Sequence, residues 1–359
     1  MPKMTFDEVI GLSKRFSTEQ YVTNFGGMVE EMAALNDSPH NRNALRQARE
    51  MIEREGEKPL PNGIVKLQRF DFGNHDNAPE LFLGEVAAVD GTYLLPIQKN
   101  TSGTLIAVGV VSNSYKRQAE ESLHGYSTKH VLSEIDPSDS QTYIQTLEKE
   151  LSSIFPTAYM RYFEALHAIE IEEKYVLCDG TLVTEWLANT SVGRSVYVEL
   201  LGNKKPIGVM KSLKDNKKFG IMGRVLKPGE LLVYETLYDH LEARAMAKQN
   251  GGPDRTMAWR SDAAFDNVAK KVWRGIFKPG SKTFGFECHE DHMSDMLRIM
   301  AADVFIENPG HEIPFLLHQV DQVARKGFAG TPLQNALQDS LSISGDDLFF
   351  DESDEHDFR

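Results

Sequence analysis

Two short apolar runs that end in the same Asp-Gly-Thr triplet constrain the fold more than any other feature of this sequence. The first run lies in VAAVDGTYLLP, residues 86–96, and the second in YVLCDGTLVTEW, residues 175–186. Both have the length and composition of a buried β-strand. A carboxylate at the end of a buried strand is unfavourable unless it is paired or bound to a metal. Asp90 and Asp179 are therefore the first candidates for a functional site.

The spacing of apolar residues changes near Ile64. Before it, segments such as YVTNFGGMVEEMAAL place apolar residues three and four apart, which predicts a helical region over residues 1–60. After it, IVKLQRFDF, ELFLGEVAAVDG and TLIAVGVVSN have the composition of successive strands, and helical patterns alternate with further strands downstream. We expect an α/β fold, with a mixed sheet flanked by helices, over residues 61–330.

The C-terminal segment, residues 331–359, ends in DDLFFDESDEHDFR, where seven of the last 14 residues are acidic. Such a composition buries too little apolar surface to fold alone, so we expect a disordered acidic tail. One interpretation is a solubilising tail. The other is a docking segment that anchors in a partner through Phe349, Phe350 and Phe358 while its acids compete with nucleic acid for basic surfaces.

The bulk composition is that of a globular protein with a substantial core. The 359 residues are 41% hydrophobic and 26% charged, and no run approaches the roughly 20 apolar residues that cross a bilayer. The first residues, MPKMTFDEVI, lack the apolar stretch of a secretory signal. Because there are only two cysteines, Cys178 and Cys288, we expect reduced thiols and a cytoplasmic protein with no membrane partner.

The net charge of −14 opposes binding to an anionic partner, but the positive charge is concentrated locally. Residues 203–227 carry eight Lys and Arg residues against the single Asp215. A second basic stretch runs from Arg255 to Lys282. Taken alone, either stretch is most simply a solvated basic face.

Two further acids lie in predicted helices. Mg²⁺ and Mn²⁺ prefer oxygen ligands, and a pair of such ions needs more carboxylates than Asp90 and Asp179 supply. Glu164 lies in AYMRYFEALHAIEI and Asp321 in IPFLLHQVDQVARKG. The simpler alternatives are a solvated glutamate and an aspartate that pairs with Arg325 four residues later.

Other chemically reactive residues give weaker signals. The segment FECHEDHM sets Cys288, His289, Glu290 and His292 close together. Adjacent residues of a strand point to opposite faces, which disfavours a zinc site there. Cys178 precedes Asp179 on a predicted strand, so it faces the opposite side and is better explained as a core thiol.

Taken together and in order, several of these motifs resemble the NurA family, nucleases that work with the HerA hexameric ATPase and have an RNase H-like fold. The resemblance spans residues 85–327 and excludes the N-terminal region and the tail. The family's usual triplet is Asp-Gly-Ser, and this chain keeps the hydroxyl with Thr in both places. The matching segments are VAAVDGTYLLP, YVLCDGTLV, PIGVMKS, FKPGSKTFGFE and IPFLLHQVDQVARKG.

The resemblance implies that Asp90 and Asp179 bind Mn²⁺ or Mg²⁺, with Glu164 as the helix carboxylate and Asp321 as the fourth acidic ligand. Lys211, in PIGVMKS, matches the strand-end lysine, which would neutralise charge on a phosphate in the transition state. Its alternative role is that of a surface lysine. The sequence leaves the helix carboxylate open between Glu164 and three competitors, namely Glu170, Glu172 and Glu173.

The leading hypothesis is a metal-dependent deoxyribonuclease with an RNase H-like fold. The resemblance also implies a homodimer and a HerA-type hexameric ATPase as partner, in DNA end processing or anti-phage defence. An actin-like ATPase is an alternative, because that related fold also holds phosphates beside an acidic strand end. A third interpretation is a non-catalytic DNA-binding assembly subunit whose acids are structural.

Overall fold

The computed structural model describes residues 39–61, 63–93, 97–99, 103–128, 131, 155–213, 217–249, 258–305 and 312–328. The chain divides into two compact units, Met1–Met51 and Ile52–Arg359. Helix α3 (Pro39–Gly56) begins in the first unit and ends in the second. The rest of the predicted N-terminal helical region and the whole acidic tail lie outside the described residues.

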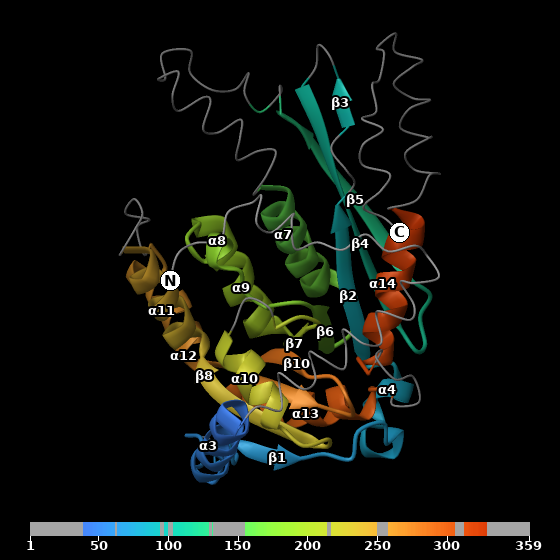
Figure 1. Ribbon diagram of the computed structural model, residues 1–359. Coiled ribbons are helices and arrows are strands. Elements are labelled where there is room, and N and C mark those ends of the chain that lie inside the picture. Colours follow the sequence, from blue (N-terminus) through green and yellow to red (C-terminus); the bar gives the residue numbers. More distant parts are fainter. Residues whose placement is uncertain are drawn as a thin grey trace, which may run out of the picture. The chain divides into compact units, whose positions relative to one another are not determined.

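The second unit contains a sheet of ten strands among the described residues (Figure 1). Their order is β1-β8-β9-β10-β7-β6-β2-β4-β3, and β5 also pairs with β4. The strands are β1 (Leu67–Arg69), β2 (Val86–Tyr93), β3 (Ile97–Lys99), β4 (Gly103–Ser114), β5 (Glu120–Ser127), β6 (Tyr175–Asp179), β7 (Lys205–Met210), β8 (Glu230–Thr236), β9 (Val272–Lys278) and β10 (Phe284–His289).

Five central strands set the topology. β2, β4 and β5 form an antiparallel meander. β6 then pairs parallel to β2, and β7 pairs parallel to β6. The resulting order, β5-β4-β2-β6-β7, is the RNase H-like arrangement, so the predicted mixed sheet flanked by helices is confirmed. Because β2 and β6 run in the same direction, their two Asp-Gly triplets lie at the same edge of the sheet.

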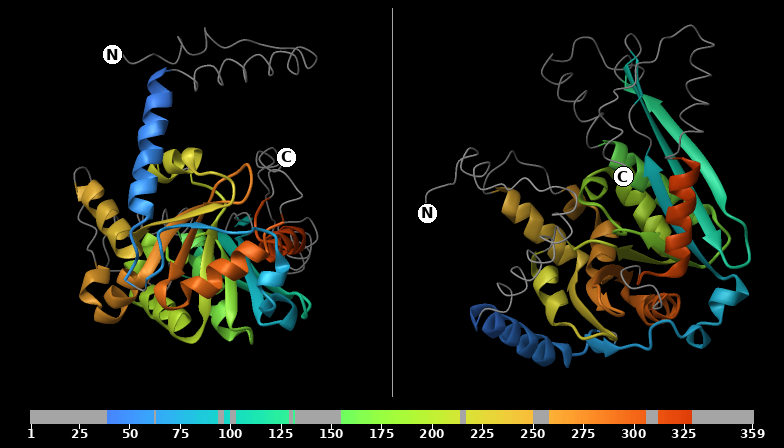
Figure 2. Two further views of the ribbon diagram at one scale, coloured as in Figure 1. Left: turned by 90° about the horizontal axis from the view of Figure 1, so that it is seen from below. Right: turned by 45° about the vertical axis from the view of Figure 1, so that its right-hand side comes forward.

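Helices cover both faces of this sheet, and the alternation of side chains along β2 shows which helices belong to which face. Val86 and Ala88 pack into one core cluster with residues of α13 (Met293–Ala302) and α14 (Phe315–Gly327). Ala87 and Val89 pack into another with α7 (Phe155–Glu170) and α9 (Ser191–Asn203). α7 and α14 therefore lie on opposite sides of β2 (Figures 1 and 2).

The remaining helices pack around this frame. A third core cluster joins the end of α3, at Ile52, to α10 and the strands β8 and β9. No helix in the described ranges is both long enough and apolar enough to cross a membrane. The other helices are α4 (Glu80–Leu83), α8 (Glu185–Ala188), α10 (Lys217–Val225), α11 (Leu237–Gln249) and α12 (Ala263–Lys271).

Two predicted strands are wrong in part. In ELFLGEVAAVDG, residues 80–83 form the short helix α4 and only the later residues form β2. Pro79 at the start, with φ −59°, and Gly84 at the end, with φ 76°, favour one helical turn. In IVKLQRFDF, only residues 67–69 form a strand, β1, which pairs with β8 alone.

Candidate active site

Three aspartates converge at the edge of the sheet where β2 and β6 end. Asp90 on β2, Asp179 on β6 and Asp321 on α14 each offer an oxygen atom, and these atoms lie within 4.8 Å of one another. Ala88 and Leu177 belong to the core cluster shared with α14, so Asp90 and Asp179, two residues on, face the same side. We call these three residues the acidic group. They line a cavity of about 540 Å³.

Lys211, just after β7, joins two members of the acidic group. Its Nζ atom lies 2.9 Å from Asp179 Oδ2 and 3.1 Å from Asp321 Oδ1. Although burial opposes its charge, the carboxylates of Asp179 and Asp90 raise the pKa of Lys211. The lysine therefore stays protonated and holds the end of β6 close to α14.

Glu164 reaches the same edge from α7, on the other face of the sheet. Its Oε2 atom accepts a hydrogen bond of 2.7 Å from Arg161 Nη1, and the same nitrogen donates to the backbone carbonyl of Asp179. Its Oε1 atom is buried and has no hydrogen-bond partner among the described residues. The carboxylate fits only because Gly91 has no side chain, since a Cβ there would lie 2.6 Å from Oε1.

The electrostatics of the site favour a bound cation. Burial, followed by the charges of Asp179 and Glu164, raises the pKa of Asp90 well above its usual range. Burial also raises the pKa of Glu164, although Arg161 opposes this. The three acids of the acidic group provide the hard oxygen ligands that Mg²⁺ and Mn²⁺ prefer. Glu164 lies outside the set of atoms within 4.8 Å, and its buried Oε1 atom has no partner in the described part of the chain. The residues present thus fit a divalent metal ion.

Glu287 on β10 holds the loop that follows Asp179. Its Oε2 atom accepts the backbone N–H groups of Leu182, at 2.8 Å, and Val183, at 3.4 Å. Its Oε1 atom accepts a hydrogen bond of 2.7 Å from Arg274 on β9. Within the loop, Gly180 adopts a φ of 86°, which favours glycine. Glu287 is not among the residues predicted from the sequence, although a charged residue in the apolar strand FGFECH is a detectable signal.

Arg161 is also absent from the predicted set. It lies three residues before Glu164, one turn of helix away, where side chains share a face. The guanidinium of Arg161 is held by Glu164 and by the backbone of Asp179, and it lines the cavity of the acidic group. An arginine at this spacing from a predicted metal-binding glutamate is a usable signal in the sequence.

The structure separates Glu164 from its three competitors. Glu170 and Glu172 are exposed. Glu173 is buried, but it pairs with Arg117 at 3.0 Å and lies before the first residue of β6, at the opposite end of the strand from Asp179. Of these four glutamates, Glu164 is the one whose carboxylate lies beside the acidic group.

Neither cysteine lies in a reactive setting. Cys288 is buried and directs its thiol to the carbonyl of Pro206. The neighbouring His292 approaches the same carbonyl at 3.2 Å, and no zinc-like group of three ligands forms here among the described residues. Cys178 packs against the cluster on the α7 side, and burial raises the pKa of its thiol to about 12. Both are core thiols.

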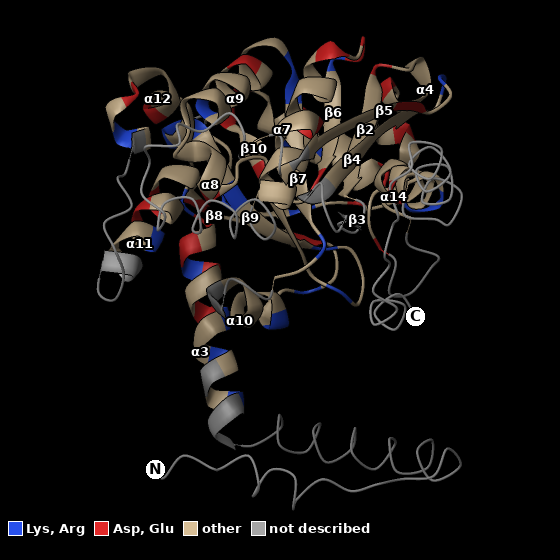
Figure 3. Cartoon of the chain, turned by 90° about the horizontal axis from the view of Figure 1, so that it is seen from above, with Lys and Arg blue, Asp and Glu red and all other residues tan. Residues whose placement is uncertain are grey.

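Several residues of the two basic stretches are neutralised by local ion pairs. In the second stretch, α12 carries both acidic and basic residues (Figure 3). Lys214 lies outside the described residues, and Lys204 donates to the backbone carbonyls of Ile171 and Glu173. The stretches therefore do not form one continuous basic face. Ion pairs in them include Lys205–Asp295, Arg260–Glu242, Lys270–Asp266, Arg274–Glu235 and Arg274–Glu287.

Comparisons with known proteins give structural similarity without sequence similarity. No protein-family model matches the sequence, and no curated protein matches it significantly. The chain is similar to the crystal structure of the NurA nuclease from Sulfolobus solfataricus, with a TM-score of 0.48 and 11% identity over 92% of this chain and 97% of that one. A structure of NurA bound to dAMP and manganese gives a TM-score of 0.45 and 11% identity, covering 91% and 98%.

A third structure, of NurA with manganese, gives a TM-score of 0.45 and 10% identity over 90% of this chain and 98% of that one. The likeness thus extends over most of both chains, at very low sequence identity. What the site can do must therefore be worked out from its own residues and distances.

Proposed function

We propose that this chain is a metal-dependent nuclease that hydrolyses phosphodiester bonds in DNA. The observation that carries the proposal is the convergence of Asp90, Asp179 and Asp321, within 4.8 Å of one another, on a cavity at the edge of the sheet. Carboxylates this close repel one another, and the ion pairs with Lys211 offset the charge of only two of them, Asp179 and Asp321. A divalent cation removes that repulsion and gives the acids a chemical role.

The acidic group, together with Glu164, would hold Mn²⁺ or Mg²⁺. When bound, such a cation polarises a phosphoryl oxygen and lowers the pKa of a water molecule. Arg161 orients Glu164 by donating to its Oε2 atom and fixes the backbone of Asp179. Glu287 holds the loop after Asp179 in place. These contacts keep the acids in the geometry that hydrolysis needs before the substrate arrives.

Lys211 has a second role in this proposal. Its ammonium group lies between Asp179 and Asp321, within reach of a phosphate held at the acidic group. A fixed cation there neutralises the negative charge that builds on phosphorus oxygens in the transition state. Water is the nucleophile in this proposal, and neither cysteine competes for that role, because both thiols pack against the cores of the protein.

Further features belong to the same proposal, and the motif resemblance supports the homodimer, the ATPase partner and the process. The nuclease domain runs over residues 61–330, after a helical region at 1–60 and before an acidic tail at 331–359. It acts as a homodimer with a HerA-type hexameric ATPase. Its process is DNA end processing or anti-phage defence. The two free cysteines support a cytoplasmic location.

The test is cleavage of linear and circular DNA by the purified protein in Mn²⁺, in Mg²⁺ and in EDTA. We expect metal-dependent cleavage that Asp90→Asn and Asp179→Asn each reduce by at least about 100-fold. Asp295→Asn, which removes an acid on α13 outside the acidic group, should cleave like the wild type. Full activity in Asp90→Asn, or no cleavage even with a HerA-type ATPase added, contradicts the proposal.

A further inference from the structure

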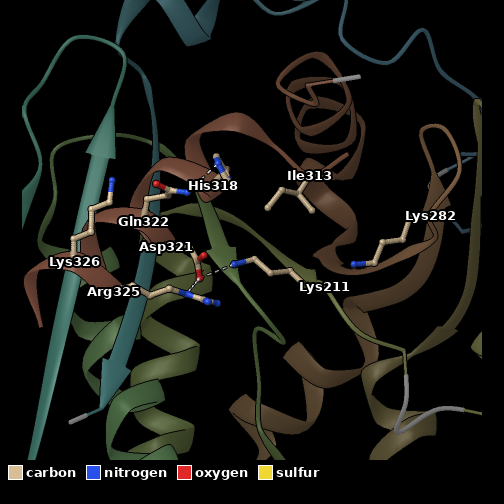
Figure 4. Close-up of a pocket in the computed structure, with 8 residues that line it drawn as sticks. All are labelled: Lys211, Lys282, Ile313, His318, Asp321, Gln322, Arg325 and Lys326. Atoms are coloured by element: carbon tan, nitrogen blue, oxygen red, sulfur yellow. Dashed lines mark hydrogen bonds and ion pairs between the residues drawn. The ribbon is translucent and has the colours of Figure 1, made fainter. Parts of the chain in front are cut away.

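A second cavity, of about 430 Å³, adjoins the acidic group on the side of α14. Figure 4 shows its lining, which comes from α14, from Ile313 just before it, from Lys211 and from the loop between β9 and β10. Asp321 and Arg325 line both this cavity and the one that contains Asp90 and Asp179, so the two cavities adjoin. We call it the cationic cavity, because its lining includes Lys211, Lys282, Arg325 and Lys326 but only one acid, Asp321.

Lys282 is placed at this cavity by a buried acid. Glu312 has 4% of its surface exposed. Its carboxylate accepts a hydrogen bond of 2.8 Å from the backbone N–H of Lys282. It also accepts hydrogen bonds of 2.9 Å from the backbone N–H and from the hydroxyl of Ser281. A Cβ on Gly280 would lie 2.7 Å from Glu312 Oε1, so the loop closes tightly on the carboxylate. The loop is therefore held in one position beside the cavity.

The outer lysines of the cationic cavity have no acidic partner in the described part of the chain. Lys282 Nζ lies 5.2 Å from the centre of the Phe284 ring, and Lys326, in the last turn of α14, makes no ion pair there. The inner cations differ, because Lys211 and Arg325 both contact Asp321. Lys282 and Lys326 thus carry positive charge that no carboxylate of the described residues neutralises.

The cavity on the other side of Asp179 is electrostatically different. It also measures about 430 Å³ and contains several arginines, but these are paired with carboxylates. A polyanion bound at the acidic group is therefore expected to extend into the cationic cavity and not into this one. The pairs are Arg161–Glu164, Arg244–Glu185, Arg274–Glu235 and Arg274–Glu287.

We propose that Lys282 and Lys326, which lie on opposite sides of Asp321 (Figure 4), bind backbone phosphates that neighbour the one being cleaved, on the same DNA strand. The inference rests on the proposed nuclease function and adds to it a substrate requirement. A substrate must carry at least two consecutive phosphates to use both the acidic group and the cationic cavity. Lysine binds phosphate as a point charge, which suits contact with a backbone independent of base sequence.

The experiment compares two substrates, a single-stranded oligonucleotide and bis(4-nitrophenyl) phosphate, which has one phosphodiester. In Lys282→Gln/Lys326→Gln, we expect the ratio of kcat/KM on the oligonucleotide to kcat/KM on the small ester to fall about 10-fold or more. Lys116→Gln, which removes an exposed lysine between β4 and β5 that does not line this cavity, is the control. It should leave the ratio unchanged.

A binding measurement in EDTA gives a readout independent of cleavage. The logarithm of the oligonucleotide binding constant should fall less steeply with the logarithm of salt concentration in the double variant. The slope should change by about 0.7 for each phosphate of a single strand that the variant no longer neutralises. Lys282→Arg/Lys326→Arg keeps both charges and should restore the wild-type slope, which separates the effect of charge from misfolding.

Each outcome decides a different point. A double variant with the wild-type ratio and salt slope overturns the phosphate site. An equal loss on both substrates also overturns it, because the lysines would then act at the scissile phosphate. A wild-type protein that cleaves neither substrate contradicts the nuclease proposal, while the salt slope still tests the cationic cavity.

Discussion

Gly91 on β2 leaves open the space into which Glu164 on α7 extends its carboxylate. A Cβ at position 91 would lie 2.6 Å from Glu164 Oε1 and 2.9 Å from Met160 Cγ. Both are closer than any normal van der Waals contact. The missing side chain thus lets an acid from one face of the sheet approach two acids that face the other. This explains why glycine follows the first aspartate.

Gly91→Ala should therefore disturb both packing and metal binding. We expect the free energy of unfolding to fall by about 1–3 kcal/mol, as in other overpacked sites. Gly202→Ala, in α9, is the matched control, because nothing lies within 4 Å of the added Cβ. It should be neutral or stabilising by up to about 1 kcal/mol. Urea unfolding measures both, and equal stabilities in the two variants would contradict the packing argument.

Two glutamates of the same helix should differ in their effect on cleavage. Glu164→Gln removes a charge beside the acidic group, so we expect nuclease activity to fall by about 100-fold. Glu170→Gln changes the exposed last residue of α7 and should keep near-wild-type activity. A time course of DNA cleavage in Mn²⁺ compares them. Equal activities in the two variants would show that Glu164 is not the helix carboxylate of the site.

Manganese should stabilise the folded protein. A ligand that binds only the folded state at 100 times its Kd adds about 2.7 kcal/mol to the free energy of unfolding. We expect the Tm of the wild type to rise with added Mn²⁺ and to return with EDTA. The rise should disappear in Asp90→Asn and persist in Asp295→Asn. A thermal shift that survives in Asp90→Asn would place the metal elsewhere.

The contact between Glu287 and Arg274 should matter more for stability than a surface ion pair. Glu287 is 1% exposed and Arg274 is 4% exposed, so replacing the acid leaves a buried guanidinium partly uncompensated. We expect Glu287→Gln to lower the free energy of unfolding by about 3 kcal/mol. Lys270→Gln, which breaks the exposed pair with Asp266, should change it by less than about 0.5 kcal/mol. Denaturant unfolding measures the loss of stability in both variants, and equal losses would contradict this prediction.

Asp303 should make stability depend on pH. Burial raises its pKa to about 7, although Tyr115 and the backbone N–H of Leu316, at the start of α14, donate hydrogen bonds to it. The folded state therefore binds a proton at pH values where the unfolded chain has lost it. From about pH 4 to 7, this group lowers the free energy of unfolding by up to about 1.4 kcal/mol per pH unit as pH rises.

Above pH 7 the contribution of Asp303 no longer changes, because both states are then unprotonated. Asp303→Asn keeps a similar shape without a titrating group. Compared with the wild type, it should lose that part of the pH dependence, which urea unfolding at pH 5 and pH 7 measures. An unchanged difference between the two pH values would assign the dependence to other groups.

The sequence predicts the parts of the site that depend on strand ends. Asp90 and Asp179 follow apolar runs in the same way, and parallel pairing brings such ends to one edge. It cannot predict contacts made across the sheet, since these depend on which helix covers which face. The charged side chains of Arg161 and Glu287 are detectable in the sequence. Their contacts with Asp179 and Leu182 belong to that class, because these partners lie 18 and 105 residues away along the chain.

Local patterns also compete with one another. ELFLGEVAAVDG has the composition of one long apolar strand, but Pro79 and Gly84 impose a helical turn on its first part. The choice of Glu164 among four glutamates depends on the orientation of α7 on the sheet, which spacing alone leaves open. Lys282 reaches the cationic cavity only because Glu312, 30 residues later, holds its loop.

The three members of the acidic group are also synthesised at different times. Its members lie between residues 90 and 321, and α14 is the last element that the structure describes. A ribosome adds roughly 5–20 residues per second, so the earlier acids emerge well before Asp321. Until α14 is made, a nascent chain lacks this acid and the second carboxylate that holds Lys211. The acidic group therefore cannot form on a nascent chain before α14 has been synthesised.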